Sequence, residues 1–210
     1  MPTLSINNLA ASRGDRTLFR SLDFSVESGQ CLHITGHNGC GKTTLLRVLC
    51  GLTRPDTGTV SWQGDSIAEN SDDYHASQAY VGHKNSMHGD LTALENLDFS
   101  TRVAGAEVGM SPVEALKLFG LQAYAHLPVR VLSQGQQRRA ALARLLLNKK
   151  PLWIMDEPFS GLDTQNTAVL YQQIERHLDQ GGMLVVTAHH GLELGKSRVS
   201  ELNLEGYKNP

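Results

Sequence analysis

Apolar and polar residues alternate with a period of two in three short stretches near the start of the chain. The stretches are Thr3 to Leu9, Leu22 to Val26 and Thr59 to Gln63, and Gly14 and Gly29 follow the first two. Such alternation is typical of half-buried strands, and glycine marks the turns between them. We therefore predict antiparallel strands that form a side sheet.

Four apolar runs lack this alternation. They are Cys31 to Thr35, Ala79 to His83, Leu152 to Met155 and Met183 to Thr187. Short continuous apolar runs are typical of strands that are buried on both faces, as in a parallel sheet. In contrast, the polar stretch from Asp65 to His75 predicts a loop with one helical turn.

The pattern from Leu91 to Asn148 is mainly helical. Capping boxes begin three helices, at Thr92 with Glu95, at Ser111 with Glu114, and at Ser133 with Gln136. The third helix is predicted to carry apolar residues as far as Leu147. This pattern indicates a helical subdomain, approximately residues 84–150, inserted into an α/β core.

A glycine-rich segment follows the first apolar run and fits the P-loop pattern of Gly, four residues, Gly, Lys, Ser/Thr. Its residues are Gly36, His37, Asn38, Gly39, Cys40, Gly41, Lys42, Thr43 and Thr44. Glycines let backbone N–H groups approach an anion, and the helix that follows turns its positive end toward the phosphates. Lys42 would reach the β- and γ-phosphates, and the Thr43 hydroxyl would be a Mg²⁺ ligand. The alternatives are a glycine-rich turn without a ligand and, for Cys40, a small tolerated residue or a redox group.

Two adjacent acids, Asp156 and Glu157, follow the apolar run that ends at Met155. Carboxylates rarely follow a buried strand unless a cation or a donor receives them. Beside a P-loop, the natural recipient is Mg²⁺, with Asp156 as its ligand and Glu157 as the general base. The alternative is a solvated turn. His189 and His190 similarly follow the run that ends at Thr187, at the edge where open parallel sheets bind ligands.

Composition narrows the function classes. The 210 residues are sufficient for one domain, residues 1–210, and the net charge of −2 does not favour nucleic-acid binding. No apolar run is long enough to span a bilayer, and no signal segment begins the chain. The three cysteines have no metal-ligand spacing and suit a reducing compartment, so we expect a cytoplasmic location.

Five motifs in this order resemble the ATP-binding subunits of ABC transporters over nearly the whole chain. They are the P-loop, the signature from Leu132 to Gln136, the pair Asp156 and Glu157, the segment from Ser160 to Asp163, and His189. The resemblance implies an α/β fold, with a P-loop NTPase (RecA-like) core, an N-terminal antiparallel β subdomain and the inserted helical subdomain. It also implies ATP and Mg²⁺ as cofactors.

Further site roles are implied by the resemblance alone. The chain would act as a homodimer with two ATP sites. Ser133 and Gly135 of one subunit would face the γ-phosphate bound by the other, and Asp163 would join the two sites. His189 would contact the γ-phosphate and the catalytic water. The bare pattern at Ser133 is also consistent with a helix cap and nothing more.

Two positions depart from the family pattern. His83 stands where most members have a glutamine that contacts Mg²⁺ and the attacking water, and Arg13 stands where an aromatic residue usually stacks on adenine. A neutral imidazole can accept from water or bind a metal, and arginine can still stack on a base. His83 is therefore a candidate catalytic residue and metal ligand, and Arg13 a candidate nucleotide-binding residue.

The segments from Tyr80 to His83 and from Leu91 to Leu97, with the Gly181-Gly182 turn, are similar to the haem-exporter ATP-binding subunit of bacterial cytochrome c maturation. This resemblance implies a peripheral ATPase on the cytoplasmic face of the inner membrane, docked on integral membrane subunits. Three alternatives remain, namely another small-substrate exporter, a soluble ABC protein acting on nucleic acid or ribosomes, and a small-molecule kinase.

Overall fold

The computed structural model describes residues 3–103 and 109–207, which form two sheets and six α-helices within these ranges. The first sheet is antiparallel and has the strand order β2-β1-β4-β5. Its strands are β1 (Thr3–Arg13), β2 (Arg16–Glu27), β4 (Thr57–Trp62) and β5 (Asp65–Ser66). The predicted antiparallel side sheet is confirmed.

The second sheet is parallel throughout and has the order β6-β7-β8-β3-β9. Its strands are β3 (Cys31–Thr35), β6 (Gln78–Val81), β7 (Leu152–Asp156), β8 (Met183–Thr187) and β9 (Val199–Asn203). Every residue of β7 and β8 is buried, as the apolar runs that make up most of each strand predict. Because the strands are parallel, the residues that follow them meet at one edge of the sheet.

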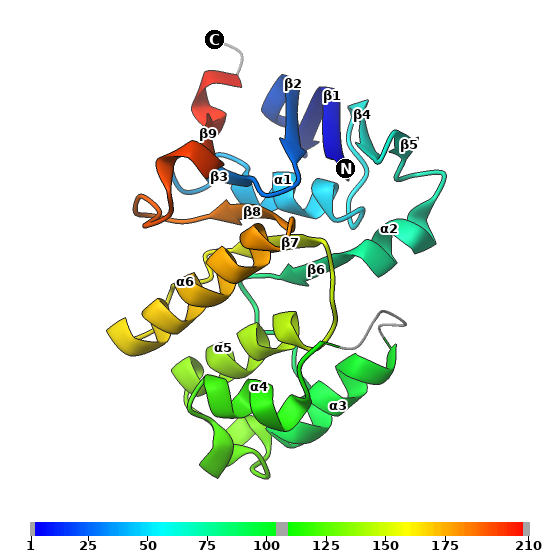
Figure 1. The fold of residues 1–210 in the computed structure, drawn as a ribbon. Coiled ribbons are helices and arrows are strands. Elements are labelled where there is room, and N and C mark those ends of the chain that lie inside the picture. The colour runs from blue at the N-terminus through cyan, green and yellow to red at the C-terminus, as the bar shows by residue number, and fades with distance from the viewer. Residues whose placement is uncertain (1–2, 104–108, 208–210) are drawn as a thin grey trace.

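The helices lie between the two sheets, beside the parallel sheet and at one end of the molecule (Figure 1). Helix α1 lies between the two sheets, α3, α4 and α5 gather at the end farther from the antiparallel sheet, and α6 lies between these helices and the parallel sheet. Their bounds are α1 (Lys42–Leu49), α2 (Ser71–Ser77), α3 (Ala93–Val103), α4 (Pro112–Leu118), α5 (Gln134–Ala143) and α6 (Thr164–Asp179). None of the helices described is long and apolar enough to cross a bilayer.

The parallel sheet separates two hydrophobic cores. Alternate residues of β7 point to opposite faces, so Leu152 and Ile154 join the core with α1, while Trp153 and Met155 join the core of helices α3 to α6. All three predicted capping boxes are present. At Ser133, for example, the hydroxyl accepts from the backbone N–H of Gln136, and the side-chain Oε1 of Gln136 accepts from the backbone N–H of Ser133.

Two local predictions were wrong. The segment from Asp65 to His75 contains a short strand and a seven-residue helix, α2, in place of a loop with one turn. Tyr74 anchors this helix, because its hydroxyl donates to the Leu49 carbonyl and its ring contacts Trp62. The third predicted helix is also shorter, since α5 ends at Ala143 and continues as a 3-10 turn.

Candidate functional site

The P-loop joins the end of β3 to the start of α1, as the motif requires. Gly41 has a φ of 116°, and a Cβ at this position would lie 3.0 Å from the Leu18 Cβ. Gly36 has a φ of 137°, and a Cβ there would lie 2.7 Å from the buried Cys40 Sγ. Only glycine fits at both positions.

The Lys42 side chain is buried against the same loop. Its Nζ donates to the Gly36 carbonyl at 2.6 Å and to the His37 carbonyl at 3.2 Å. On the outer side of the loop, the His37 N–H donates to Oε1 of Glu205 at 2.7 Å, and the His37 Nδ1 lies 2.8 Å from the same oxygen. The C-terminal segment therefore supports the P-loop directly.

Asp156 at the end of β7 faces the start of α1. Its Oδ2 accepts from the Thr43 hydroxyl at 2.8 Å, and its Oδ1 accepts from the Thr187 hydroxyl at 2.7 Å. Asp156 is 2% exposed, and its carboxylate lies beside the hydroxyl that the P-loop pattern assigns to Mg²⁺. Hydroxyl and carboxylate oxygens are ligands that Mg²⁺ prefers, so this pair fits a magnesium ion.

Glu157 has an unusual backbone conformation, with a φ of 48°. The turn is fixed because its N–H donates to both the carbonyl and the hydroxyl of Thr187, at 3.2 and 2.9 Å. Its Oε1 lies 3.0 Å from the Nε2 of His189, which follows β8. Strained positions of this kind are frequent at functional sites, where they aim a side chain. The sequence placed both residues at this edge of the sheet, and the structure adds the contact between them.

Arg138 of α5 connects the elements around this site, and the sequence alone did not indicate it. Its guanidinium donates to the carbonyls of Gly82, Asp156 and Glu157, at 2.7, 2.8 and 2.9 Å. Burial lowers the pKa of Arg138, whereas the nearby charges of Asp156 and Glu157 raise it. A single buried cation therefore ties the signature helix to the ends of β6 and β7.

The start of the signature helix α5 lies beside the segment from Ser160 to Asp163 of the same chain. A Cβ on Gly135 would lie 3.2 Å from the Gly161 carbonyl oxygen, so the two backbones are close. Asp163 caps α6 by accepting from the backbone N–H of Asn166 at 2.8 Å, and its carboxylate also accepts from the Asn166 side-chain amide. These hydrogen bonds lower the pKa of Asp163. Ser133 is exposed at the α5 N-terminus, where backbone N–H groups favour an anion.

The other two candidate residues are less closely joined to the site. His83 is exposed and follows β6, whose Val81 pairs with Met155, so the register brings it to the level of Glu157. Arg13 is exposed at the tip of the hairpin formed by β1 and β2. Among the described residues, neither side chain has a hydrogen-bond partner, so their roles stay predictions.

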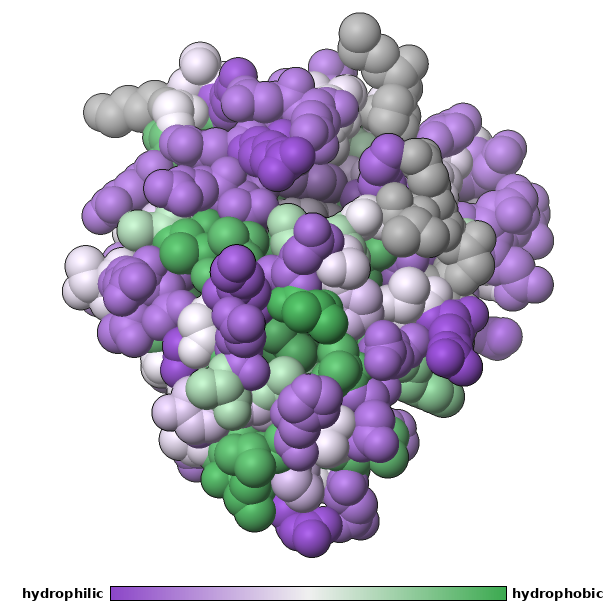
Figure 2. All heavy atoms as spheres, turned by 60° about the horizontal axis from the view of Figure 1, so that its bottom comes forward, coloured by the Kyte–Doolittle hydropathy of each residue, from purple (hydrophilic) through white to green (hydrophobic). Residues whose placement is uncertain are grey.

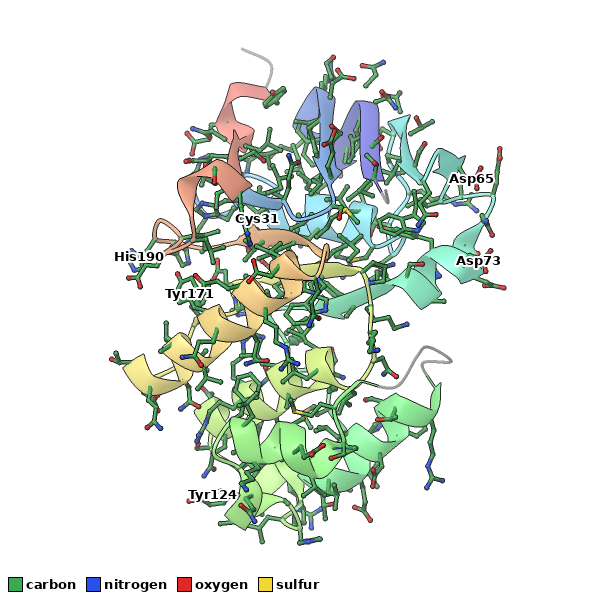
Figure 3. All side chains as sticks on the ribbon, viewed as in Figure 1. Cys31, Asp65, Asp73, Tyr124, Tyr171 and His190 are labelled. Atoms are coloured by element: carbon green, nitrogen blue, oxygen red, sulfur yellow. The ribbon has the colours of Figure 1, made fainter. Side chains whose placement is uncertain are left out.

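The carboxyl-terminal edge of the parallel sheet carries the P-loop, Asp156, Glu157 and His189. In Figure 3, His190 lies on one side of the molecule, whereas Asp65 and Asp73, which belong to the β5–α2 region, lie on the other side. The edge combines a P-loop, a buried carboxylate bonded to the Thr43 hydroxyl, and a strained acid paired with a histidine. Such a combination is suited to hydrolysis of a nucleoside triphosphate.

Comparison with known proteins agrees with this chemistry. The ABC transporter family model matches residues 19–160. The cytochrome c biogenesis ATP-binding export protein CcmA of Nitrosococcus oceani is 43% identical over 202 residues, which cover 96% of this chain and 93% of that protein. The chain therefore belongs to the ABC transporter family, whose members bind and hydrolyse ATP.

Solved structures support the fold. A putative ABC transporter ATP-binding protein from Pyrococcus furiosus superposes with a TM-score of 0.81 at 20% identity, covering 99% of this chain and all of that one. A dimeric ATP-binding cassette bound to ADP and Pi, MJ0796, gives a TM-score of 0.79 at 24% identity, over 89% of this chain and 88% of that one. The α/β fold predicted from the sequence is confirmed.

Arg138→Met should lower kcat for ATP hydrolysis about tenfold, equivalent to about 1.4 kcal/mol, while the KM for ATP changes little. The substitution removes the donor shared by three carbonyls, including that of Glu157, and frees the turn that aims the Glu157 carboxylate. Steady-state kinetics measure the split between kcat and KM. Arg139→Met is the matched control, because Arg139 donates to the Phe119 carbonyl instead. An equal loss in both variants would contradict a positioning role for Arg138.

His83→Gln should flatten the pH dependence of hydrolysis. Histidine is the side-chain type that can change its charge near physiological pH, whereas an amide cannot, so only the unchanged protein could bring a positive charge toward the predicted metal ligands. Rates measured from about pH 8 to about pH 6 should therefore fall more steeply in the unchanged protein than in the variant. His88→Gln, at another exposed histidine, is the control. Superimposable profiles for His83→Gln and the unchanged protein would exclude this role.

Proposed function

We propose that the chain is the ATP-hydrolysing subunit of a bacterial inner-membrane export complex. The complex would deliver haem, or release a haem-loaded carrier, for assembly of c-type cytochromes. The observation that carries this proposal is the 43% identity, over nearly the full length of both chains, to a protein named for export in cytochrome c biogenesis. The chain would lie peripherally on the cytoplasmic face of the membrane.

The site residues have defined roles in this proposal. Lys42 and the P-loop N–H groups bind the phosphates of ATP, and Thr43 and Asp156 hold Mg²⁺. When bound there, Mg²⁺ would supply positive charge to the phosphates. Glu157 accepts a proton from the attacking water, and His189 orients the Glu157 carboxylate through their 3.0 Å contact.

Two copies of the chain would enclose two ATP molecules. The N-terminus of α5 is exposed and carries the Ser133 capping box, so it offers an anion site that the P-loop of the same chain does not use. The γ-phosphate bound by the other copy would fill this site. Closure on ATP and opening after hydrolysis would then move the helical region relative to the sheet.

Apolar side chains on the helical region support docking on membrane subunits. Most of the large apolar side chains exposed in the described ranges belong to this region, namely Leu91, Phe99, Val113, Tyr124, Leu127 and Val131, and Leu52 is the exception. Figure 2 turns the end of the molecule with α3, α4 and α5 toward the viewer. It shows separate apolar patches set among hydrophilic side chains. Exposed apolar patches rimmed by polar residues are typical of interaction sites.

Ser133→Arg should prevent formation of the ATP-bound dimer while leaving ATP binding by the monomer unchanged. The added cation and bulk would occupy the anion site at the α5 N-terminus. Size-exclusion chromatography with ATP, in a chain that also carries Glu157→Gln, measures dimer formation. Ser111→Arg is the matched control, because Ser111 caps α4 through an equivalent capping box and has no phosphate to bind. Normal dimerisation of the Ser133 variant would contradict the two-site arrangement.

The test of the whole proposal is purification of the tagged Glu157→Gln chain with ATP from native membranes. Small membrane subunits together with a haem-loaded carrier are the expected result, identified by mass spectrometry and haem absorbance. Recovery of a different permease would retain the ATPase mechanism and overturn the haem assignment. Recovery of ribosomes or nucleic acid in place of membrane proteins would favour a soluble ABC protein.

A further inference from the structure

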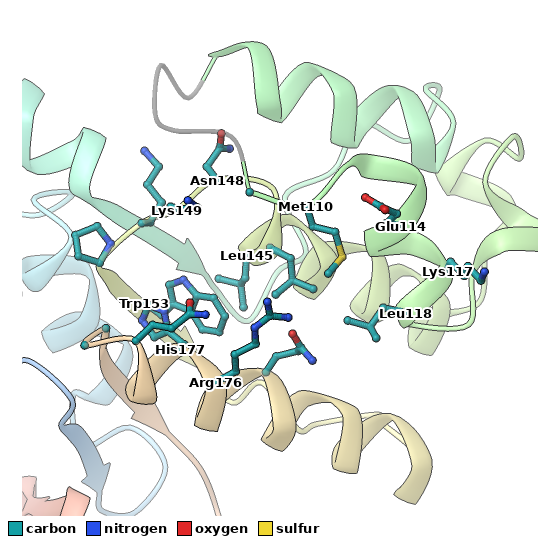
Figure 4. A pocket seen from close by; sticks show the side chains of 18 residues that line it. Met110, Glu114, Lys117, Leu118, Leu145, Asn148, Lys149, Trp153, Arg176 and His177 are labelled. Atoms are coloured by element: carbon teal, nitrogen blue, oxygen red, sulfur yellow. The ribbon is translucent and has the colours of Figure 1, made fainter.

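A groove of about 980 Å³ lies between α4 and α6 (Figure 4), and we name it the α4–α6 groove. Its floor includes Trp153 at the start of β7 and Gly182 just before β8. The groove is therefore at the amino-terminal edge of the parallel sheet, opposite the edge that carries the P-loop and Asp156. None of the residues assigned above to ATP binding or hydrolysis lines it.

Two buried polar side chains line the groove, and each has one polar atom without a hydrogen-bond partner among the described residues. The Nε1 of Trp153 and the Oδ1 of Asn148 are both buried, and no group among the described residues bonds to either atom. The side chains are 4% and 8% exposed. Buried polar atoms are usually paired, because an unpaired one costs free energy. One N–H donor and one carbonyl acceptor thus remain unsatisfied in a single groove.

The Trp153 ring is held firmly in place. It stacks on His177 of α6, with the ring centroids 4.0 Å apart and the planes 7° from parallel. His177 is in turn fixed by a 3.1 Å contact between its Nε2 and the Met183 carbonyl. Burial lowers the pKa of His177 to about 4, so the ring is neutral near neutral pH. The indole N–H is therefore a preorganised donor.

The remaining walls combine apolar side chains with positive charge. Arg176 extends from α6 toward Leu145, and Leu118 lies on the facing helix (Figure 4). Glu114 is the only acidic residue that lines the groove within the described ranges, and its carboxylate already accepts from the N–H and the hydroxyl of Ser111. The Arg176 side chain has no ion-pair or hydrogen-bond partner among the described residues. The groove thus favours an apolar ligand that carries a negative charge.

We propose that the α4–α6 groove binds an extended peptide segment of a partner protein, with an acidic side chain flanked by apolar ones. An extended peptide offers backbone carbonyls, one of which would accept from the Trp153 N–H, and backbone N–H groups, another of which would donate to the Asn148 oxygen. The acidic side chain pairs with Arg176, and the apolar side chains contact Leu118 and Leu145. The volume is at the upper end of the range for small-molecule pockets, which also suits a peptide. This inference goes beyond the proposed function and does not depend on the exported cargo.

The indole N–H signal of Trp153 in ¹H–¹⁵N NMR spectra of the full chain provides the test. The chain has two tryptophans, and Trp62→Phe identifies which indole signal belongs to Trp153. The probe is the capped peptide acetyl-Leu-Asp-Leu-Glu-Leu-amide. The expected result is a saturable downfield movement of the Trp153 signal, as the N–H gains an acceptor, and a weakening of binding by at least about fivefold in Arg176→Gln.

Two controls distinguish recognition of an acidic peptide from binding of any peptide and from loss of the fold. The peptide with lysine in place of both acidic residues should not move the Trp153 signal, and ATP binding should be unchanged in Arg176→Gln, which verifies its fold. An equal response to succinate would overturn the peptide proposal in favour of a small-anion site. No movement of the Trp153 signal over the whole titration, or equal binding by the lysine peptide, would also overturn it. Each result is independent of membrane partners, so failure here leaves the proposed export function untouched.

Discussion

Glu157→Gln should lower ATP turnover by at least about 100-fold while ATP binding persists, because a positioned general base contributes about 10²- to 10⁴-fold to such reactions. Glutamine has the size of glutamate, and its amide can still bond to the His189 Nε2 that lies 3.0 Å from Oε1. The geometry of the turn is therefore retained, whereas the group that accepts the proton is lost. Phosphate release measures turnover, and calorimetry measures the affinity for ATP.

The matched control is Glu175→Gln on the exposed side of α6, which makes the same chemical change away from the sheet edge. It should leave turnover unchanged. Turnover near the normal rate in Glu157→Gln would remove Glu157 as the base. Loss of ATP affinity in the same variant would instead assign the residue to nucleotide binding.

Lys42→Ala should lower the affinity for ATP by about 10- to 150-fold, which corresponds to about 1.5 to 3 kcal/mol for a hydrogen bond to a charged group. Lys42 is buried, and its ammonium group already lies within the P-loop, 2.6 Å from the Gly36 carbonyl oxygen. The variant removes the charge that would contact the β- and γ-phosphates and also leaves two loop carbonyls without this donor. Titration calorimetry with ATP measures the loss.

Lys117→Ala, at an exposed lysine of α4, tests whether loss of any positive charge has the same effect. Its affinity for ATP should match that of the unchanged chain, because a distant surface charge is screened by salt. Unchanged affinity in Lys42→Ala would contradict the assignment of the P-loop as the phosphate site.

Local sequence signals predicted most of the elements and the main groups of the site. The capping boxes at Ser111 and Ser133 join residues three positions apart, so the sequence alone contains both partners. The buried runs before Asp156 and His189 likewise placed these side chains at one edge, because parallel strands end together. The capping boxes depend only on residues close together in the sequence, and the position of the site residues depends only on the common direction of the strands.

The missed features depend on contacts between residues far apart in the chain. Helix α2 is anchored by Tyr74 on the Leu49 carbonyl, 25 residues away, so its polar sequence predicted a loop. Arg138 reaches carbonyls 56, 18 and 19 residues away. An arginine in a helix is normally solvated, and its burial follows only from the packing of α5 on the sheet. No local pattern distinguishes such a residue before the fold is known.

The contact between Glu205 and the P-loop also has a consequence for synthesis of the chain on the ribosome. Glu205 is 168 residues from His37, and Leu204 lies 3.5 Å from the position of a Cβ on Gly41, so a segment made later supports a loop made earlier. Strand β9, which directly precedes this segment, pairs with β3, the strand that leads into the P-loop. We therefore expect the growing chain to bind ATP only after the segment around Glu205 has left the ribosome and can contact the P-loop.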